Sequence, residues 1–218
     1  MLSLLFVAAV QPPVAPAPRV ADPFARWEKN IAAIEKQLKA DPPKPGAVFF
    51  AGSSSIVLWD LKKWFPDKDY VNVGFGGSVI RDSTHFAPRI LTPHKPGTII
   101  FYAGDNDIAQ NRTPEQLLGD FRAFVSAVRK DNPGCRVLFI PVKPSIARWK
   151  RYDTQTRANA LVRDECAKGE HLGYIDIVSL MIGADGMPDP VLFVKDGLHL
   201  SPKGYEIWTA EVSKALEK

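Results

Sequence analysis

The chain of 218 residues contains little cysteine and histidine, and its charges are nearly balanced. Two cysteines cannot build the disulfide framework of a small secreted domain. Among the four histidines, His85 and His94 have no partners at metal-ligand spacing. With 28 basic residues against 24 acidic ones and no long basic stripe, the sequence does not indicate a nucleic-acid-binding protein. We therefore expect no metal, no cofactor and no nucleic-acid partner.

The sequence also lacks an apolar run long enough to cross a membrane. Its N-terminal apolar segment spans residues 1–10, about half of what a membrane-spanning helix needs. A Pro- and Ala-rich stretch follows, in which neither a helix nor a sheet ladder can form. A short apolar segment of this kind is typical of a secretory signal peptide, although no Lys or Arg precedes it.

These features divide the chain into two parts. We expect residues 1–21 to be a signal peptide and linker, and residues 22–218 to form a single domain. The protein is then exported to the periplasm or secreted, without stable membrane insertion. If the apolar run is not a functional signal, the protein is cytoplasmic.

The domain has an ordinary globular composition, with 45% hydrophobic and 24% charged residues. Short apolar runs typical of strands alternate along it with helical patterns. The runs span residues 47–52, 70–74, 98–104, 136–142 and 173–178. Because they are almost continuously apolar, we expect strands that are buried on both faces of a parallel sheet.

Helical spacing or helix caps occur between these runs. The helical segments span residues 24–38, 113–132, 152–168 and 201 to the C-terminus. Strands that alternate with helices predict a single α/β domain with one five-stranded parallel sheet, covered on both faces. Ligands of such sheets bind at the carboxyl ends of the strands. Cys135 and Cys166 would lie at one end of this sheet, either as a disulfide or as two separate buried thiols.

Small polar segments with glycine follow four of the five predicted strands. They are Gly52-Ser53-Ser54-Ser55, Gly74-Phe75-Gly76-Gly77-Ser78, Gly104-Asp105-Asn106-Asp107 and, further from its strand, Asp196-Gly197-Leu198-His199. Each segment alone is explained by a turn or a helix cap. Together they contain a hydroxyl, an amide and an Asp/His pair, which is the set that ester hydrolysis by a serine needs.

The roles follow from the chemistry of each group. A hydroxyl of the serine segment, Ser54 or a neighbour, is the nucleophile at the start of a helix. His199 is the general base and then the general acid, and Asp196 fixes its tautomer. The backbone N–H groups of Ser54 and Gly77 and the side-chain amide of Asn106 form the oxyanion hole. Asn106 suits this role because an amide, unlike a carboxylate, donates hydrogen bonds.

These segments resemble the four blocks of the SGNH, or GDSL-type, hydrolases, in the family's order, from about Ala47 to the C-terminus. The resemblance implies a three-layer α/β/α, flavodoxin-like fold and hydrolysis of esters, such as acyl esters of lipids (lysophospholipids included) or acetylated sugars. It selects Ser54 from the three neighbouring serines. The family's Asp before the nucleophile is Ser53 here, a change that removes no member of the triad.

The residues leave several alternatives open. Arg148 and Trp149 follow the fourth strand and either contact the substrate or form a solvated rim. A chain with this fold can also serve as a non-catalytic glycan-binding module of the cell envelope. A third hypothesis is a metal-dependent phosphoesterase that uses Asp105, Asp107, Asp196 and His199, although two-metal sites usually need more ligands.

Overall fold

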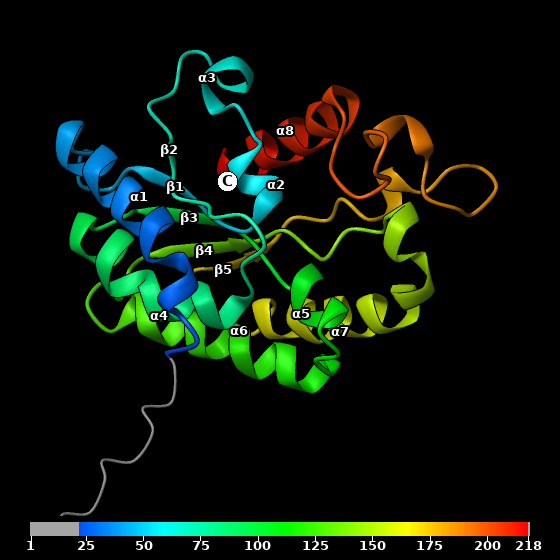
Figure 1. Cartoon of the computed structure of the whole chain (residues 1–218), viewed down its shortest axis with the longest axis horizontal. Coiled ribbons are helices and arrows are strands. Elements are labelled where there is room, and N and C mark those ends of the chain that lie inside the picture. Colours follow the sequence, from blue (N-terminus) through cyan, green and yellow to red (C-terminus); the bar gives the residue numbers. More distant parts are fainter. Residues whose placement is uncertain (1–21, 218) are drawn as a thin grey trace, which may run out of the picture.

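The computed structural model describes residues 22–217, so the predicted signal peptide and linker of residues 1–21 lie outside the described residues. Five strands form one parallel sheet in the order β2-β1-β3-β4-β5 (Figure 1). They are β1 (Val48–Gly52), β2 (Val71–Asn72), β3 (Thr98–Tyr102), β4 (Arg136–Phe139) and β5 (Leu172–Tyr174). The predicted five-stranded parallel sheet is thereby confirmed.

Helices cover both faces of the sheet, which makes three layers (Figure 1). The helices on one face are α1 (Glu28–Ala40), α4 (Ile80–Ile90), α6 (Pro114–Arg129) and α7 (Tyr152–Cys166). Those on the other face are α2 (Ser54–Val57), α3 (Leu61–Trp64) and α8 (Pro202–Leu216). None of the helices in residues 22–217 is long and apolar enough to span a membrane.

Short helices complete the chain. One turn and a half of α-helix, α5 (Asp105–Ala109), follows β3 directly. The 3₁₀ helices are η1 (Ala25–Trp27), η2 (Thr92–His94), η3 (Ile146–Arg151), η4 (Ser179–Met181) and η5 (Pro190–Leu192). Three strands, β2, β4 and β5, are each three residues shorter than predicted. Single ladder bonds continue beyond β2, from Val73 N to Phe50 O and from Phe75 N to Gly52 O, both at 2.9 Å.

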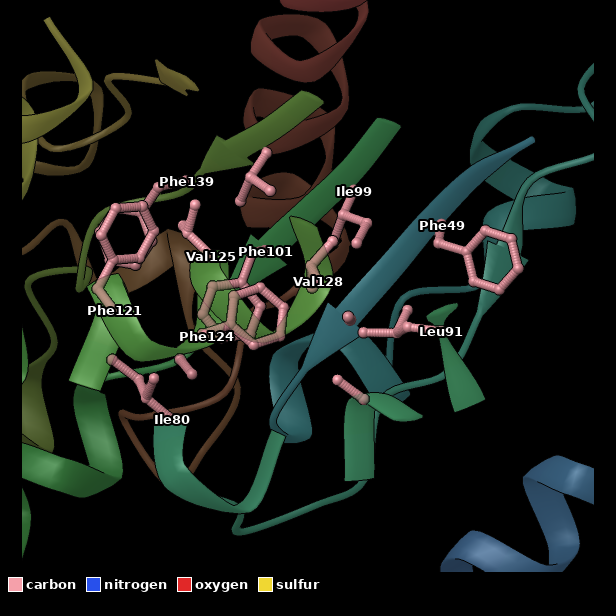
Figure 2. Packing of buried hydrophobic residues seen from close by; sticks show 14 of the residues in the cluster. Phe49, Ile80, Leu91, Ile99, Phe101, Phe121, Phe124, Val125, Val128 and Phe139 are labelled. Carbon is pink, nitrogen blue, oxygen red and sulfur yellow. The ribbon is translucent and has the colours of Figure 1, made fainter. Parts of the chain in front are cut away.

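The alternation of side chains along each strand separates two hydrophobic clusters. In β3, Phe101 points to the layer of α6, where its ring stacks on Phe124 with 3.9 Å between ring centroids (Figure 2). The next residue, Tyr102, points to the opposite layer and packs edge-on against Trp208 of α8. These side chains are almost completely buried. Each one contributes about 1.5–3 kcal/mol by leaving water.

The two cysteines are free thiols. Cys135 and Cys166 are both buried but unpaired, so the second of the two alternatives for them is the one observed. Burial raises the pKa of the Cys135 thiol to about 11 and that of Cys166 to about 12. At neutral pH both side chains behave as small hydrophobic groups of the α6–α7 layer.

The strand order places the segments after β1 and β3 beside each other. The chain passes from β1 to β2 on one side and then crosses to β3 on the other side of β1. Such a reversal opens a crevice at the carboxyl ends of the two strands. Gly52 and Tyr102, the last residues of β1 and β3, are register partners. The segments that begin at Ser53 and at Ala103 therefore start from the same level of the sheet.

Candidate active site

A hydrogen-bonded relay joins Ser54, His199 and Asp196. The His199 Nε2 atom lies 3.0 Å from Ser54 Oγ, although 145 positions separate the two residues in sequence. The Nδ1 atom of the same ring lies 2.6 Å from Asp196 Oδ2. Asp196 Oδ1 also accepts hydrogen bonds from the backbone N–H groups of Leu198 and His199, at 2.8 and 2.9 Å. The loop thus fixes its own carboxylate against its own imidazole.

The bonds to Asp196 set its protonation state. The hydrogen bond with the His199 ring, followed by those from the two backbone N–H groups, lowers the pKa of Asp196 to about 2. Asp196 is therefore an anion across the neutral range. An anion at this position accepts a hydrogen bond from Nδ1–H, so Nδ1 keeps its proton and Nε2 is the nitrogen that faces Ser54.

Burial distinguishes the three neighbouring serines. Ser53 and Ser55 are 2% and 1% exposed, whereas Ser54 is partly exposed at the surface of the crevice. Of the three hydroxyls, the one that contacts His199 is that of Ser54. The serine that the family resemblance selected is therefore the one whose hydroxyl contacts the imidazole.

A tight turn between β1 and α2 presents Ser54. Gly52 has a φ of +130°, and a Cβ atom there would lie 1.9 Å from the Tyr102 carbonyl oxygen, so a larger residue cannot occupy the position without moving β3. The backbone N–H of Ser53 donates to that same carbonyl at 3.0 Å. The turn is consequently tied to the neighbouring strand, and Ser54 starts the helix that follows.

Three hydrogen-bond donors lie around the crevice. Within residues 22–217, the backbone N–H groups of Ser54 and Gly77 donate to no other protein group. Gly77 has a φ of +80° and an exposed position, which suits a residue without a side chain. The Asn106 Nδ2 atom donates one hydrogen bond to the Ser78 carbonyl at 3.0 Å, and its second hydrogen has no partner among the described residues.

Arg148 and Trp149, which we considered as substrate contacts, have partners within the protein. Arg148 Nη2 donates to Asn106 Oδ1 at 2.9 Å, and its Nη1 lies 2.8 Å from Asp105 Oδ1. The Trp149 ring stacks on Tyr152, with centroids 4.3 Å apart. Both side chains are partly exposed, so contact with a substrate remains a proposal for Trp149.

A buried lysine near the site was missed by the sequence analysis. Lys143 is 1% exposed, and its Nζ atom lies 2.9 Å from Tyr102 Oη and 3.2 Å from Asp105 Oδ2. Burial alone would raise the pKa of Asp105, but Lys143 and Arg148 keep it below the ordinary value. The signal for Lys143 is its place directly after the apolar run of residues 137–142, because a lysine buried beside such a run needs an anionic partner.

The four residues of the phosphoesterase hypothesis do not converge. Asp105 contacts two cations, whereas both oxygens of Asp107 accept from the Ile80 backbone N–H, at 3.1 and 3.3 Å. In the part of the chain that the structure describes, no three His, Cys, Asp or Glu side chains are arranged to hold a metal ion. The geometry does not support that hypothesis.

Asp107 leads to a prediction about stability and pH. The side chain is fully buried, and burial raises its pKa from 3.8 to about 7. Between about pH 4 and 7 the folded state therefore binds more protons than the unfolded state, so stability falls as pH rises. In Asp107→Asn this loss is absent. We expect the free energy of unfolding of Asp107→Asn, relative to that of the wild type, to increase by on the order of 4 kcal/mol between pH 4 and 8.

Urea unfolding at several pH values measures this difference. The exposed Asp131→Asn variant is the control, since that side chain makes no side-chain hydrogen bond within residues 22–217. If the free energies of unfolding of Asp107→Asn and the wild type changed with pH in the same way, the Asp107 carboxyl would be ionised in the folded protein throughout this range.

A cavity of about 540 Å³ adjoins the relay on the side of His199 and Asp196. Its walls include the apolar side chains of Leu58, Trp64 and Val194. Leu58 and Val194 are 54% and 44% exposed, which is unusual for large apolar residues. The cavity is therefore an open, mainly apolar surface next to the imidazole.

Comparison with known proteins places these residues in a family. The model of the GDSL-like lipase/acylhydrolase family matches residues 51–207, a range that contains the relay and the three donors. A search of curated proteins found no significant match to the sequence.

Solved structures resemble the chain in fold at low sequence identity. A protein from Streptococcus pneumonia named for platelet activating factor has a TM-score of 0.74 and 19% identity, covering 87% of this chain and 92% of its own. A GDSL-like lipase from Bacteroides thetaiotaomicron has a TM-score of 0.67 and 22% identity, covering 89% and 97%. A carbohydrate esterase family 3 protein from Talaromyces cellulolyticus has a TM-score of 0.63 and 16% identity, covering 78% and 95%. The three-layer α/β fold is shared by all three.

Proposed function

Because the chain belongs to the GDSL-like lipase/acylhydrolase family, whose activity is ester hydrolysis, we propose that it cleaves carboxylic esters with Ser54 as nucleophile, His199 as general base and Asp196 as the carboxylate that orients it. The observation that carries this proposal is the relay from Ser54 Oγ through both nitrogens of His199 to Asp196. The distance of 3.0 Å is that of a hydrogen bond through which Ser54 can pass its proton to His199, and the contact of 2.6 Å with Asp196 orients the ring.

The reaction proceeds in two halves. Ser54 Oγ attacks the ester carbonyl while His199 Nε2 takes its proton, and the carbonyl oxygen becomes an oxyanion. The donors from Ser54, Gly77 and Asn106 stabilise that charge. The intermediate then collapses, the alcohol leaves with the proton from His199, and the acyl group stays on Ser54. Water, activated by His199, releases the acid and restores the serine.

The cavity beside His199 supports a proposal about the substrate. The leaving alcohol takes its proton from His199, so the alcohol part of the ester lies on the same side as this cavity. An aromatic and apolar wall suits an alcohol with a broad apolar or sugar face. We therefore propose acyl or acetyl esters of lipid or sugar alcohols. The carbohydrate esterase and lipase names of the structural neighbours agree with this range.

Trp64→Ala tests the cavity. Its indole ring lines the cavity, and removing it takes away apolar contact surface. We expect KM for 1-naphthyl acetate to rise about 5- to 20-fold, since the lost contact is worth about 1–2 kcal/mol. KM for methyl acetate, whose alcohol is too small to reach the wall, is the internal control. Equal changes for both esters would place the alcohol elsewhere.

Labelling with a fluorophosphonate tests the function itself, because the reagent phosphonylates an activated serine. We expect one equivalent of label per chain, located by peptide mass spectrometry on Ser54 and absent from Ser54→Ala. Labelling of Ser53 or Ser55 would overturn the assignment of the nucleophile. Failure to label, together with binding of acetylated glycan fragments without hydrolysis, would favour a glycan-binding module.

A further inference from the structure

The side-chain amide of Asn106 contacts two groups, and each of them is compatible with only one orientation of the amide. Its Oδ1 atom faces Arg148 Nη2 at 2.9 Å, and its Nδ2 atom faces the Ser78 carbonyl at 3.0 Å. A guanidinium only donates hydrogen bonds, and a carbonyl oxygen only accepts them. Rotating the amide by 180° would therefore place donor against donor and acceptor against acceptor. Arg148 and Ser78 together fix which end of the amide carries the hydrogens.

Arg148 in turn contacts a buried ion pair. Its Nη1 atom lies 2.8 Å from Asp105 Oδ1, and Lys143 Nζ lies 3.2 Å from the other oxygen of that carboxylate. The Asp105 and Lys143 side chains are 5% and 1% exposed. Gln155 Nε2 adds a long contact of 3.4 Å to Asp105 Oδ1. The guanidinium is thus bound to a carboxylate that is buried and paired with a second cation.

We propose that Arg148 is a positioning residue for the oxyanion hole, an inference that rests on the proposed function of Asn106. By bonding Oδ1, Arg148 keeps the free Nδ2 hydrogen directed into the crevice beside Ser54. A flipped amide would present an oxygen to the developing oxyanion and repel it. The positive charge also polarises the amide, which makes Nδ2–H a stronger donor.

This role accounts for the geometry better than a substrate contact does. Two nitrogens of the guanidinium are engaged by Asp105 and Asn106, and the side chain is 19% exposed. Arg148 also has non-helical backbone angles, φ −121° and ψ 18°, inside η3. This departure from helical geometry occurs at the residue whose side chain joins η3 to the start of α5.

The test is a double-mutant cycle between Arg148 and Asn106, measured with p-nitrophenyl acetate. We expect Arg148→Ala to lower kcat about 10- to 100-fold and to change KM less than about 3-fold, because the lost interaction acts in the transition state. In the Asn106→Ala background the same substitution should change kcat less than about 3-fold, since the amide through which it acts is gone.

Arg151→Ala is the matched control. Arg151 also joins η3 to α5, through Nη1 to the Ile108 carbonyl at 2.9 Å and to Asn111 Oδ1 at 3.1 Å, and it does not contact Asn106. We expect its kcat to stay within about 2-fold of the wild type, on the scale of a near-neutral surface change. Arg148→Lys, which keeps one donor and the charge, should recover part of the activity that Arg148→Ala loses.

Other outcomes overturn the inference. If the effects of Arg148→Ala and Asn106→Ala multiply, Arg148 acts independently of the amide. If Arg148→Ala raises KM for an anionic ester and leaves kcat unchanged, it binds substrate. If Arg148→Ala does not fold, the cycle is measured with Arg148→Lys and read in the same way. If Ser54→Ala retains full activity, the proposed function itself is wrong. If Ser54→Ala is inactive but the effects of Arg148→Ala and Asn106→Ala are additive in free energy, only the role of Arg148 is wrong.

Discussion

Ser54→Ala is expected to lower kcat by on the order of 10⁴- to 10⁶-fold, the loss typical of removing the nucleophile of a serine hydrolase. The substitution deletes one partly exposed hydroxyl whose contact is the His199 ring, so the fold should be unaffected. His199→Ala should cost about as much, because without a base the hydroxyl is a weak nucleophile. Steady-state hydrolysis of p-nitrophenyl acetate measures both losses, and thermal unfolding checks that the variants are folded.

The double variant Ser54→Ala/His199→Ala gives a sharper result than either single one. The effects of residues that act as one unit are strongly non-additive. We therefore expect the kcat of the double variant to lie within about 10-fold of the kcat of Ser54→Ala. Ser53→Ala is the matched control, since its buried side chain lies one position away and does not contact His199. Turnover that is unchanged in Ser54→Ala, or lost equally in Ser53→Ala, would contradict the assignment of Ser54.

The second large effect is expected at Asn106. Asn106→Ala removes one of three donors to the oxyanion and should lower kcat about 100- to 1000-fold with little change in KM. Ser54 would remain labelled by fluorophosphonate, although more slowly, because the relay with His199 is intact. Stopped-flow measurement of the acylation rate would separate this defect from one in substrate binding.

Asn106→Asp provides the matched comparison for this prediction. The side chain keeps its shape, but an oxygen replaces the Nδ2 atom that donates to the Ser78 carbonyl. A carboxylate next to Arg148 stays ionised and repels the oxyanion, so we expect a larger loss of kcat than in Asn106→Ala. Equal or higher activity in Asn106→Asp would show that the side chain at this position does not donate to the transition state.

Several parts of the fold were predictable because their signals are local. The capping box at Thr113 and Gln116 marks the start of α6, and both reciprocal hydrogen bonds are present. By contrast, α4 (Ile80–Ile90) was missing from the predicted helices. Its buried face includes the polar Asp82 and Ser83, and Pro88, a residue that usually ends a helix, lies inside it.

The residues of the candidate site could be predicted from the sequence, but the contacts that hold some of them in place could not. The strand-end rule and the four motifs brought Ser54, Gly77, Asn106, Asp196 and His199 to one edge of the sheet, because each motif directly follows its strand or lies in one short loop. Nothing in residue order revealed that Arg148 contacts Asn106 across 42 positions, or that Lys143 and Asp105 pair across 38. Such contacts depend on how η3 and the segment after β4 pack over α5.

The amino-acid sequence by itself determined an α/β fold with one parallel sheet, and it placed the candidate side chains for ester hydrolysis at the carboxyl ends of the strands. Apolar runs and turn residues carry that information, since backbone preferences and the alternation of side chains act over a few residues. Only the tertiary structure decided that the cysteines stay apart and that Arg148 contacts the amide of Asn106, and it placed the hydroxyl of Ser54, which the family resemblance had selected, against the imidazole. Burial and long-range pairing arise only when the layers close on each other, and a side chain's partners are then set by packing and desolvation.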